Sequence, residues 1–300
     1  MKTSEKMIQE AIWAGLNDPS IDDKDADILV LGVPYDGSVS FRSGAKDGPR
    51  AIREITYTIP PTTEQFRSLK PLKIKDLGDI QAESRDDLFK ITRTKIQEIV
   101  SRGQKFTVIG GDHSITIPVL QGINDALDEP FGIIHIDAHF DLCDTLEGDR
   151  LSHGSTERRA LELENVSREN MFFIGIRSIE EDELDFITDH PVNVVSAYDF
   201  DKLKVDGVLK HVKDKLGHLN KIYITLDIDC LDPAYAAGTG TPQFGGLTSR
   251  QLLNLLEGLF DLPIMGFDLV EVAPNLDPAM TSVFAARKII TECFGHFLYK

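Results

Sequence analysis

The stretch IIHIDAHFD (residues 133–141) joins a buried strand to a cluster of charged side chains. Its apolar first half is typical of a strand inside a sheet. Successive side chains of a strand point to opposite faces, so an extended backbone would turn Asp137, His139 and Asp141 the same way. Three such groups side by side would be costly to bury. A bound cation would remove this conflict, and the stretch therefore predicts a metal site at the end of a core strand.

Similar apolar runs recur along the chain, and most are continuously apolar rather than alternating. Such runs are typical of strands that are covered on both faces. They span 27–33, 72–78, 105–111, 131–137, 171–176, 192–197, 221–229 and 264–272. Helical patterns lie between most of them, among them 49–55, 86–102, 249–259 and 280–294. This alternation predicts a parallel sheet of about eight strands with helices on both faces.

The composition is that of a soluble globular protein. The 300 residues are 41% apolar and 27% charged and show no repeat or interior linker, so we expect a single domain over 1–300. A net charge of −17 argues against nucleic acid or an anionic membrane as a partner. No membrane span or signal peptide is evident, which favours a cytoplasmic location. The three cysteines form no CxxC motif, which argues against a disulfide framework or a thiolate zinc site.

Four polar clusters directly follow predicted strands, at the sheet edge where parallel α/β proteins bind their ligands. These clusters are VIGGDHS (108–114), IDAHFD (136–141), TLDIDC (225–230) and DLVEVAP (268–274). We predict that six of their side chains bind metal: His113, Asp137, His139, Asp141, Asp227 and Asp229. An oxygen-rich set without thiolates suits Mn²⁺ or a similar divalent ion. Four carboxylates neutralise two such ions, so the sequence favours a two-metal site that activates water.

These clusters, together with SHGS (152–155), GTGTP (238–242) and the block at 32–53, resemble the signature motifs of the ureohydrolase family of arginases and agmatinases. The resemblance covers nearly the whole chain. It implies a three-layer αβα sandwich, two Mn²⁺ ions per chain held by the same six ligands, and hydrolysis of a guanidino group to urea and an amine. It also implies that the protein is a homotrimer or homohexamer.

The same resemblance assigns catalytic roles to His153, Glu271 and Asp141. His153 matches the residue that carries a proton to the departing amine, and an imidazole titrates in the range that this task requires. Glu271 matches the acid that contacts the guanidinium, which a carboxylate binds through two parallel hydrogen bonds. Both residues are therefore expected to touch the substrate.

The segment LCDTLEGDRLS (142–152) is expected to contact the tail of the substrate. It departs from the Asn- and Ser/Thr-rich stretch of arginases, and the other motifs are closer to the agmatinase branch. We therefore predict agmatine as the substrate, hydrolysed to putrescine and urea, a step of polyamine biosynthesis. Asp144 and Arg150 are the predicted tail contacts. Asp144 suits an amine, whereas Arg150 would suit 4-guanidinobutanoate or another guanidino acid; arginine is a further alternative.

Two alternative functions, a binuclear phosphoesterase and a non-catalytic metal-binding protein, fit the sequence less well. A binuclear phosphoesterase would need an Asn-His pairing and a basic cluster for phosphate, and neither is present in the sequence. A non-catalytic metal-binding relative would be expected to have lost metal ligands, His153 or Glu271, and all of these are present. We interpret His135 as a buried histidine behind the ligands rather than a seventh ligand, and Asp112 as a capping group. The loop GTGTP either shapes the pocket wall or forms a plain turn.

Overall fold

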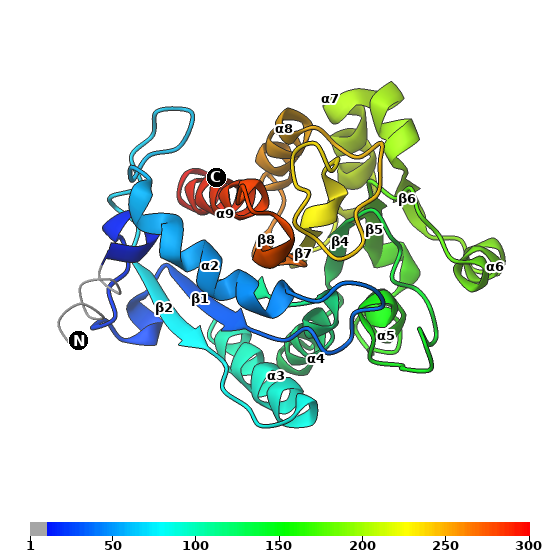
Figure 1. The fold of residues 1–300 in the computed structure, drawn as a ribbon, viewed down its shortest axis with the longest axis horizontal. Helices are drawn as coiled ribbons and strands as arrows, with labels where there is room; N and C mark the ends of the chain where they lie inside the picture. The colour runs from blue at the N-terminus through cyan, green and yellow to red at the C-terminus, as the bar shows by residue number, and fades with distance from the viewer. Residues whose placement is uncertain (1–10) are drawn as a thin grey trace.

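The computed structural model describes residues 11–300, and an eight-stranded sheet lies at its centre (Figure 1). The strand order is β2-β1-β3-β8-β7-β4-β5-β6, and every neighbouring pair is parallel. The strands are β1 (Ile28–Val33), β2 (Ile74–Asp79), β3 (Lys105–Gly110), β4 (Gly132–Ile136), β5 (Met171–Ile174), β6 (Asn193–Val195), β7 (Ile222–Asp227) and β8 (Ile264–Val270).

Helices cover both faces of this sheet (Figure 1). One face carries α2 (Gly48–Ile55), α7 (Ala197–Leu216), α8 (Ser249–Leu259) and α9 (Thr281–Tyr299). The other carries α3 (Arg85–Ser101), α4 (Thr116–Ala126) and α5 (Thr156–Ala160), and α6 (Glu181–Asp189) lies beyond the β6 edge. Alternate residues of β1 enter the two cores, with Val30 on the α2 side and Leu31 on the α3 side. The predicted three-layer sandwich is confirmed.

Local sequence signals explain where several helices begin. The hydroxyl of Ser84 accepts a hydrogen bond from the amide of Asp87 at the start of α3, and Ser196 caps α7 in the same way. Thr248 and Gln251 form a reciprocal capping box at the start of α8. The predicted bounds of α8 are confirmed, α3 is shifted by one residue, and α9 continues to Tyr299. None of the helices in residues 11–300 is long and apolar enough to cross a membrane.

The register of the central strands places their carboxyl ends at one level. Leu269 of β8 pairs with Ile109 of β3 and with Leu226 of β7, which in turn pairs with Ile136 of β4. The segments that follow these residues therefore leave the sheet side by side. This edge collects the four polar clusters.

One expectation about these clusters is wrong. The strand β4 ends at Ile136, so Asp137, His139 and Asp141 do not alternate along an extended backbone. Residues 137–141 form an irregular loop, and Asp141 has a left-handed φ of 54°. Likewise, β7 ends at Asp227, and Asp229 lies in the short 3₁₀ turn Ile228–Cys230. The side chains converge because the loops bend, not because strand residues alternate.

Candidate metal centre

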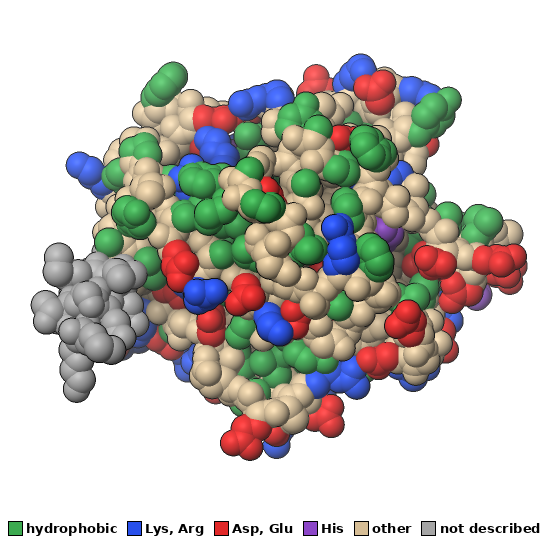
Figure 2. Space-filling view, in the orientation of Figure 1, with side chains coloured by type: hydrophobic (Ala, Val, Ile, Leu, Met, Phe, Trp, Pro, Cys, Tyr) green, Lys and Arg blue, Asp and Glu red, His purple; other side chains and the backbone are tan. Residues whose placement is uncertain are grey.

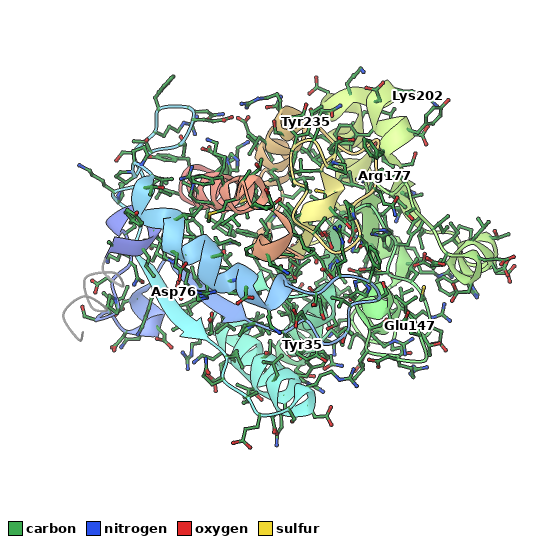
Figure 3. The ribbon with its side chains drawn as sticks, in the orientation of Figure 1. Tyr35, Asp76, Glu147, Arg177, Lys202 and Tyr235 are labelled. Carbon is green, nitrogen blue, oxygen red and sulfur yellow. The ribbon has the colours of Figure 1, made fainter. Side chains whose placement is uncertain are left out.

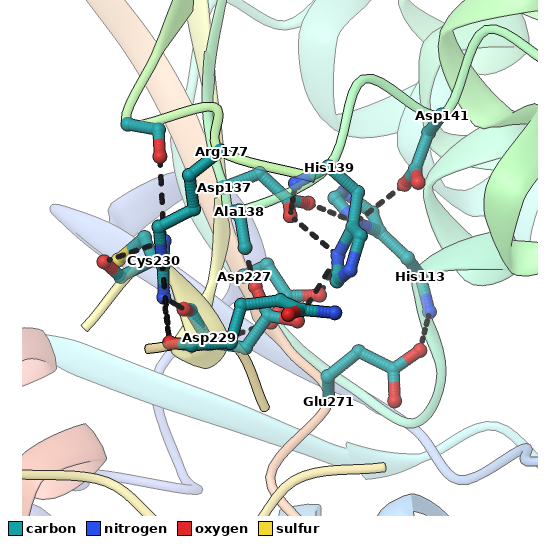
Figure 4. Close-up of polar contacts among 12 residues, drawn as sticks. His113, Asp137, Ala138, His139, Asp141, Arg177, Asp227, Asp229, Cys230 and Glu271 are labelled. Atoms are coloured by element: carbon teal, nitrogen blue, oxygen red, sulfur yellow. Dashed lines mark hydrogen bonds and ion pairs between the residues drawn. The ribbon is translucent and has the colours of Figure 1, made fainter. Parts of the chain in front are cut away.

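The structure brings all six predicted ligands together beyond the carboxyl edge of the sheet (Figure 4). Three carboxylates surround His113. Its Nδ1 lies 3.0 Å from Oδ2 of Asp137, 3.0 Å from Oδ2 of Asp141 and 3.5 Å from Oδ2 of Asp227. Residues from the carboxyl ends of three strands, β3, β4 and β7, thus share one small volume.

A second group forms around His139. Its Nδ1 lies 3.2 Å from Oδ2 of Asp229 and 3.4 Å from Oδ1 of Asp137. Asp137 therefore belongs to both groups, with Oδ2 directed toward His113 and Oδ1 toward His139. The ligand atoms of Asp137, His139 and Asp229 all lie within 4.8 Å of one another. Two adjacent cation sites that share one carboxylate fit this arrangement.

An identical local turn builds each of the motifs that carry these ligands. In each turn an aspartate oxygen accepts a hydrogen bond from the main-chain amide two residues further on. The bond is 2.7 Å from His139 to Asp137, 2.7 Å from Asp229 to Asp227 and 3.0 Å from Ser114 to Asp112. An aspartate at the strand end thus bends the backbone directly after the strand. The capping role predicted for Asp112 is seen in the third of these turns.

The residues present fit a pair of hard or borderline divalent cations. Nδ1 of His113 and Oδ2 of Asp137 are buried and form no hydrogen bond of acceptable angle, although they lie 3.0 Å apart. Unpaired polar atoms in the interior are costly, and a cation would satisfy both. The donors are carboxylate oxygens and imidazole nitrogens, with no thiolate among the six.

Without a cation, protons compensate the charges of this cluster. Burial lowers the pKa of His139, but Asp229 and Asp137 outweigh that effect and raise the pKa to about 12. Burial, and then the charge of Asp229, raises the pKa of Asp227 well above its usual range. Cation binding must therefore displace protons from the same side chains.

His135 lies behind the ligands, stacked on His113 with ring centroids 5.2 Å apart. Its Nε2 lies close enough to Asp137 to join a metal group geometrically. However, both of its nitrogens face acceptors, since Nδ1 lies 3.0 Å from Oε1 of Glu157 and Nε2 lies 3.0 Å from the carbonyl oxygen of His139. No lone pair of His135 is then directed at a cation, which supports its interpretation as a supporting residue.

His153 and Glu271 lie next to each other. Nδ1 of His153 is 3.1 Å from Oε1 of Glu271, which also accepts the main-chain amide of His113 at 3.0 Å. Burial lowers the pKa of His153, but Glu271 raises it more, to about 9. Nε2 faces Ser40, whose main-chain amide donates to it at 3.1 Å and whose hydroxyl lies 2.9 Å away and can accept its proton. Nδ1 carries a proton directed at Glu271 in both the neutral and the cationic form of the ring.

A cavity of about 330 Å³ opens onto these residues. It is lined by Ser40, His113, His139, Asp141, Cys143, Leu146, Glu147, His153, Gly154, Ser178, Ile179, Glu180, Glu183, Asp227, Thr241 and Gln243. Glu271 does not line it and lies one layer deeper, with a left-handed φ of 62°. The loop GTGTP is a pocket wall rather than a plain turn, because Thr241 lines the cavity. A side chain at Gly240 would place its Cβ 2.9 Å from the carbonyl oxygen of Arg42.

The structure does not bring Asp144 or Arg150 into the cavity. Both side chains are about half exposed and pair with each other, with Nη1 of Arg150 3.0 Å from Oδ1 of Asp144. Arg150 also contacts Glu162, and Asp144 accepts a hydrogen bond from Arg159. These surface ion pairs turn both side chains away, and their predicted contact with the substrate tail is corrected accordingly.

Three acids line the cavity: Glu147, Glu180 and Glu183. Glu147 belongs to the segment 142–152 that was expected to contact the substrate tail, whereas Glu180 and Glu183 were not predicted from the sequence. Glu147 lies on the loop beside α5 (Figure 3), and acidic side chains gather over α6 (Figure 2). No lysine or arginine is among the lining residues of the described chain. The acids at 180–183 follow the strand β5, so the rule that sites lie beyond strand ends could have found them.

A parallel three-layer sandwich with carboxylates and imidazoles gathered beyond its carboxyl edge defines an α/β protein with a candidate metal centre. Comparison with known proteins shows to which family of α/β proteins the chain belongs. The model of the family described as "Arginase family" matches residues 26–295. The chain is 35% identical over 287 residues to proclavaminate amidinohydrolase of Streptomyces clavuligerus, covering 91% of this chain and 88% of that protein. It is 37% identical over 279 residues to an agmatinase of Neisseria meningitidis serogroup A, covering 89% and 86%.

The solved structure of the Streptomyces clavuligerus amidinohydrolase superimposes with a TM-score of 0.87 at 32% identity and covers 95% of this chain and 96% of its own. The chain therefore belongs to the arginase family. It is a ureohydrolase of the agmatinase-like type, a hydrolase acting on guanidino or amidine compounds.

Proposed function

We propose that the protein hydrolyses agmatine to putrescine and urea at a binuclear Mn²⁺ centre. The observation that carries this proposal is the cavity, which joins the six-ligand cluster to a wall with three glutamates and no basic side chain. A substrate with a guanidinium at one end and an ammonium at the other matches both ends of this cavity. A carboxylate on the substrate tail would find no lysine or arginine among the lining residues, so it would lack the bidentate or ammonium partner that such a group requires.

In this proposal His113, Asp137, His139, Asp141, Asp227 and Asp229 hold the two cations. When bound, the cations supply Lewis acidity and a water molecule whose pKa is close to neutral. The shared carboxylate of Asp137 and the turns at Asp137 and Asp227 hold the donor atoms in place before any cation arrives. This fixed geometry limits the reorganisation needed on binding.

The chain's own residues orient the substrate and handle the proton. Glu271 lies one layer below the cavity, with Oε1 held by His153 and by the main-chain amide of His113. Its role in this proposal is to bind the guanidinium, which stays cationic at ordinary pH, through its other oxygen once that group has entered past His153. His153 lines the cavity and donates a hydrogen bond from Nδ1 to Glu271, so it stands at the point where the departing amine needs a proton. A proton added to that nitrogen occupies its lone pair and so prevents the amine from attacking the carbon atom again. The apolar side chains of Ile179 and Leu146 line the same cavity and can contact the alkyl part of the substrate.

A guanidino acid such as 4-guanidinobutanoate is the second candidate, because one of the similar proteins is proclavaminate amidinohydrolase rather than agmatinase. The sequence-based reason for this candidate was Arg150, which is held at the surface by Asp144 and Glu162. The geometry therefore favours agmatine.

The test is urea release from agmatine, 4-guanidinobutanoate and arginine, each at several concentrations, with protein stripped of metal and then supplied with Mn²⁺. We expect activity only after Mn²⁺ is added, with agmatine the best substrate by kcat/KM. Full activity of the stripped protein would disprove the metal dependence, and a preference for 4-guanidinobutanoate would disprove the substrate assignment alone.

The remaining expectations stay predictions. These are one domain over the whole chain, a cytoplasmic location and a homotrimer or homohexamer. Sedimentation of the purified protein tests the last, since a single chain would have a mass of 33.4 kDa.

A further inference from the structure

Arg177 lies just beyond β5 and contacts main-chain carbonyls from several loops of the carboxyl edge (Figure 3, Figure 4). Its guanidinium donates hydrogen bonds to the carbonyl oxygens of Gly175, Asp229, Cys230, Leu231, Gln243 and Phe244. Among the ion pairs of the described residues none includes Arg177. Its N–H groups thus bind main-chain carbonyl oxygens rather than a carboxylate. A planar guanidinium with five donors suits that task, and an ammonium does not.

The first of these contacts fixes a metal-binding turn. Nη2 of Arg177 lies 2.7 Å from the carbonyl oxygen of Asp229, and it also reaches Leu231 at 3.2 Å. The main-chain amide of Arg177 donates to the carbonyl oxygen of Ala138 at 2.8 Å. The amide of Ala138 in turn donates to Oδ1 of Asp229 at 3.2 Å. Arg177 therefore connects the two loops that carry Asp229 and His139.

The second set of contacts fixes the wall of the cavity. The same Nη2 lies 2.7 Å from the carbonyl oxygen of Gln243, and Nε lies 3.2 Å from it and from the carbonyl oxygen of Phe244. Gln243 lines the cavity, and so does Ser178, which follows Arg177 in the chain. A shift of this wall would pull on the atom that also holds the main chain of Asp229.

We propose that Arg177 is a positioning residue that couples the wall facing the substrate tail to the turn that carries Asp229. The inference rests on the proposed function, since it assumes two cations and a tail-bearing substrate. It predicts that loss of the guanidinium weakens the cation site of Asp229 and the selectivity for the tail together, whereas His113 and its own carboxylates are left in place.

The test compares Arg177→Met and Arg177→Lys with Arg42→Met. Arg42 holds the same wall, through the carbonyl oxygens of Gly240 at 3.0 Å and Thr239 at 2.9 Å, and no hydrogen bond of its side chain reaches a ligand loop. Equilibrium dialysis measures Mn²⁺ bound per chain. The ratio of kcat/KM for agmatine to that for methylguanidine, which lacks a tail, measures selectivity.

At a Mn²⁺ concentration that loads two ions in the wild type, we expect Arg177→Met to bind one. The affinity of the cation site that contains Asp229 should be lowered about 10-fold or more. The selectivity ratio should fall in the same variant. Arg177→Lys should behave similarly, because a lysine lacks the planar fork. Arg42→Met should bind two Mn²⁺ and change only the selectivity ratio.

A second substitution, Gly246→Ala, displaces the guanidinium of Arg177 without replacing the arginine. A Cβ added at Gly246 would lie 2.6 Å from Nη2 of Arg177, 2.5 Å from the main-chain nitrogen of Asp232 and 2.6 Å from the main-chain carbon of Leu231. Gly246→Ala therefore displaces both the guanidinium and the main chain that it holds, and it should reproduce the paired loss even if the Arg177 variants do not fold. Wild-type metal content and wild-type selectivity in folded Arg177→Met or in Gly246→Ala would overturn the inference. Failure of the wild-type protein to bind Mn²⁺ or release urea would instead overturn the proposed function.

Discussion

The hydroxyl of Thr225 lies 2.8 Å from Nε2 of His113 and donates its own proton to Asp268, whose Oδ1 is 2.8 Å away. A hydroxyl that donates to a carboxylate can only accept from the imidazole, so His113 keeps a proton on Nε2. Its Nδ1 is thereby directed at the three surrounding carboxylates. The ligand atom of His113 is thus selected by a threonine on β7, a strand that β8 separates from β3.

The first prediction follows from this contact. Thr225→Val keeps the shape of the side chain but leaves Nε2 of His113 without a partner and Oδ1 of Asp268 with only the main-chain amide of Leu226. We expect unfolding free energy to fall by about 1–3 kcal/mol and Mn²⁺ affinity to fall about 10-fold or more. Calorimetry measures both quantities. Thr225→Ser, which retains the hydroxyl, is the matched control and should restore the affinity.

The second prediction concerns the shared metal site. Asp229→Asn removes an anionic donor from the group formed with Asp137 and His139, so the variant should lose turnover and bind one Mn²⁺ weakly. Metal analysis after dialysis measures the content. Asp144→Asn, which changes an exposed carboxylate outside the cavity, should retain two Mn²⁺ per chain and wild-type turnover. Equal metal content and rate in Asp229→Asn would show that Asp229 is only structural.

The third prediction separates proton transfer from metal binding. His153→Ala should keep both cations and lose about 10²–10⁴-fold in kcat, the usual contribution of general acid–base catalysis. His211→Ala is the control, because that ring is exposed on α7, where its Nδ1 lies 2.7 Å from the carbonyl oxygen of Gly207. A kcat within threefold of wild type for His153→Ala, at about the level of the control, would contradict the proton-shuttle role.

The fourth prediction tests the acidic wall of the cavity. Glu147→Gln should lower kcat/KM for agmatine about 2- to 5-fold, since an exposed ion pair contributes up to about 1 kcal/mol. The rate for methylguanidine should not change, because that compound has no ammonium tail. Arg150→Ala should leave both substrates unaffected, given its surface pairing with Asp144 and Glu162. If the wild-type protein hydrolyses 4-guanidinobutanoate faster than Arg150→Ala does, Arg150 contacts the substrate and this assignment is wrong.

The fifth prediction is the pH dependence of metal binding. The pKa of His139 is raised to about 12 in the cation-free cluster, so its proton is bound at neutral pH and must leave when a cation binds. Affinity for Mn²⁺ should therefore rise with pH across the neutral range, about tenfold per pH unit for each proton displaced. Titration calorimetry in buffers of different ionisation enthalpy counts the protons released. A pH-independent affinity would show that the cluster binds no protons before the cation.

The sequence by itself determined the layers of the fold and the identity of the metal-ligand candidates. Continuous apolar runs identified the strands because a sheet covered on both faces needs no alternation. The ligand motifs could be found because Asp-x-His-x-Asp and Asp-x-Asp at strand ends combine a turn-forming residue with a donor atom two positions away. Such signals are local, so they can be recognised in the sequence without knowing which strands are neighbours in the sheet.

Only the tertiary structure decided what faces the cavity. Asp144 and Arg150 lie in the loop that the sequence indicated, but their charges are satisfied by each other and by Glu162 on the surface. Glu147 from that loop and Glu180 from the loop after β5 line the cavity in their place. Which side chain of a loop points inward depends on ion pairs and backbone bends formed between distant segments, and no local pattern encodes those contacts. The same holds for Thr225 and Arg177, whose partners come from other strands and loops of the folded chain.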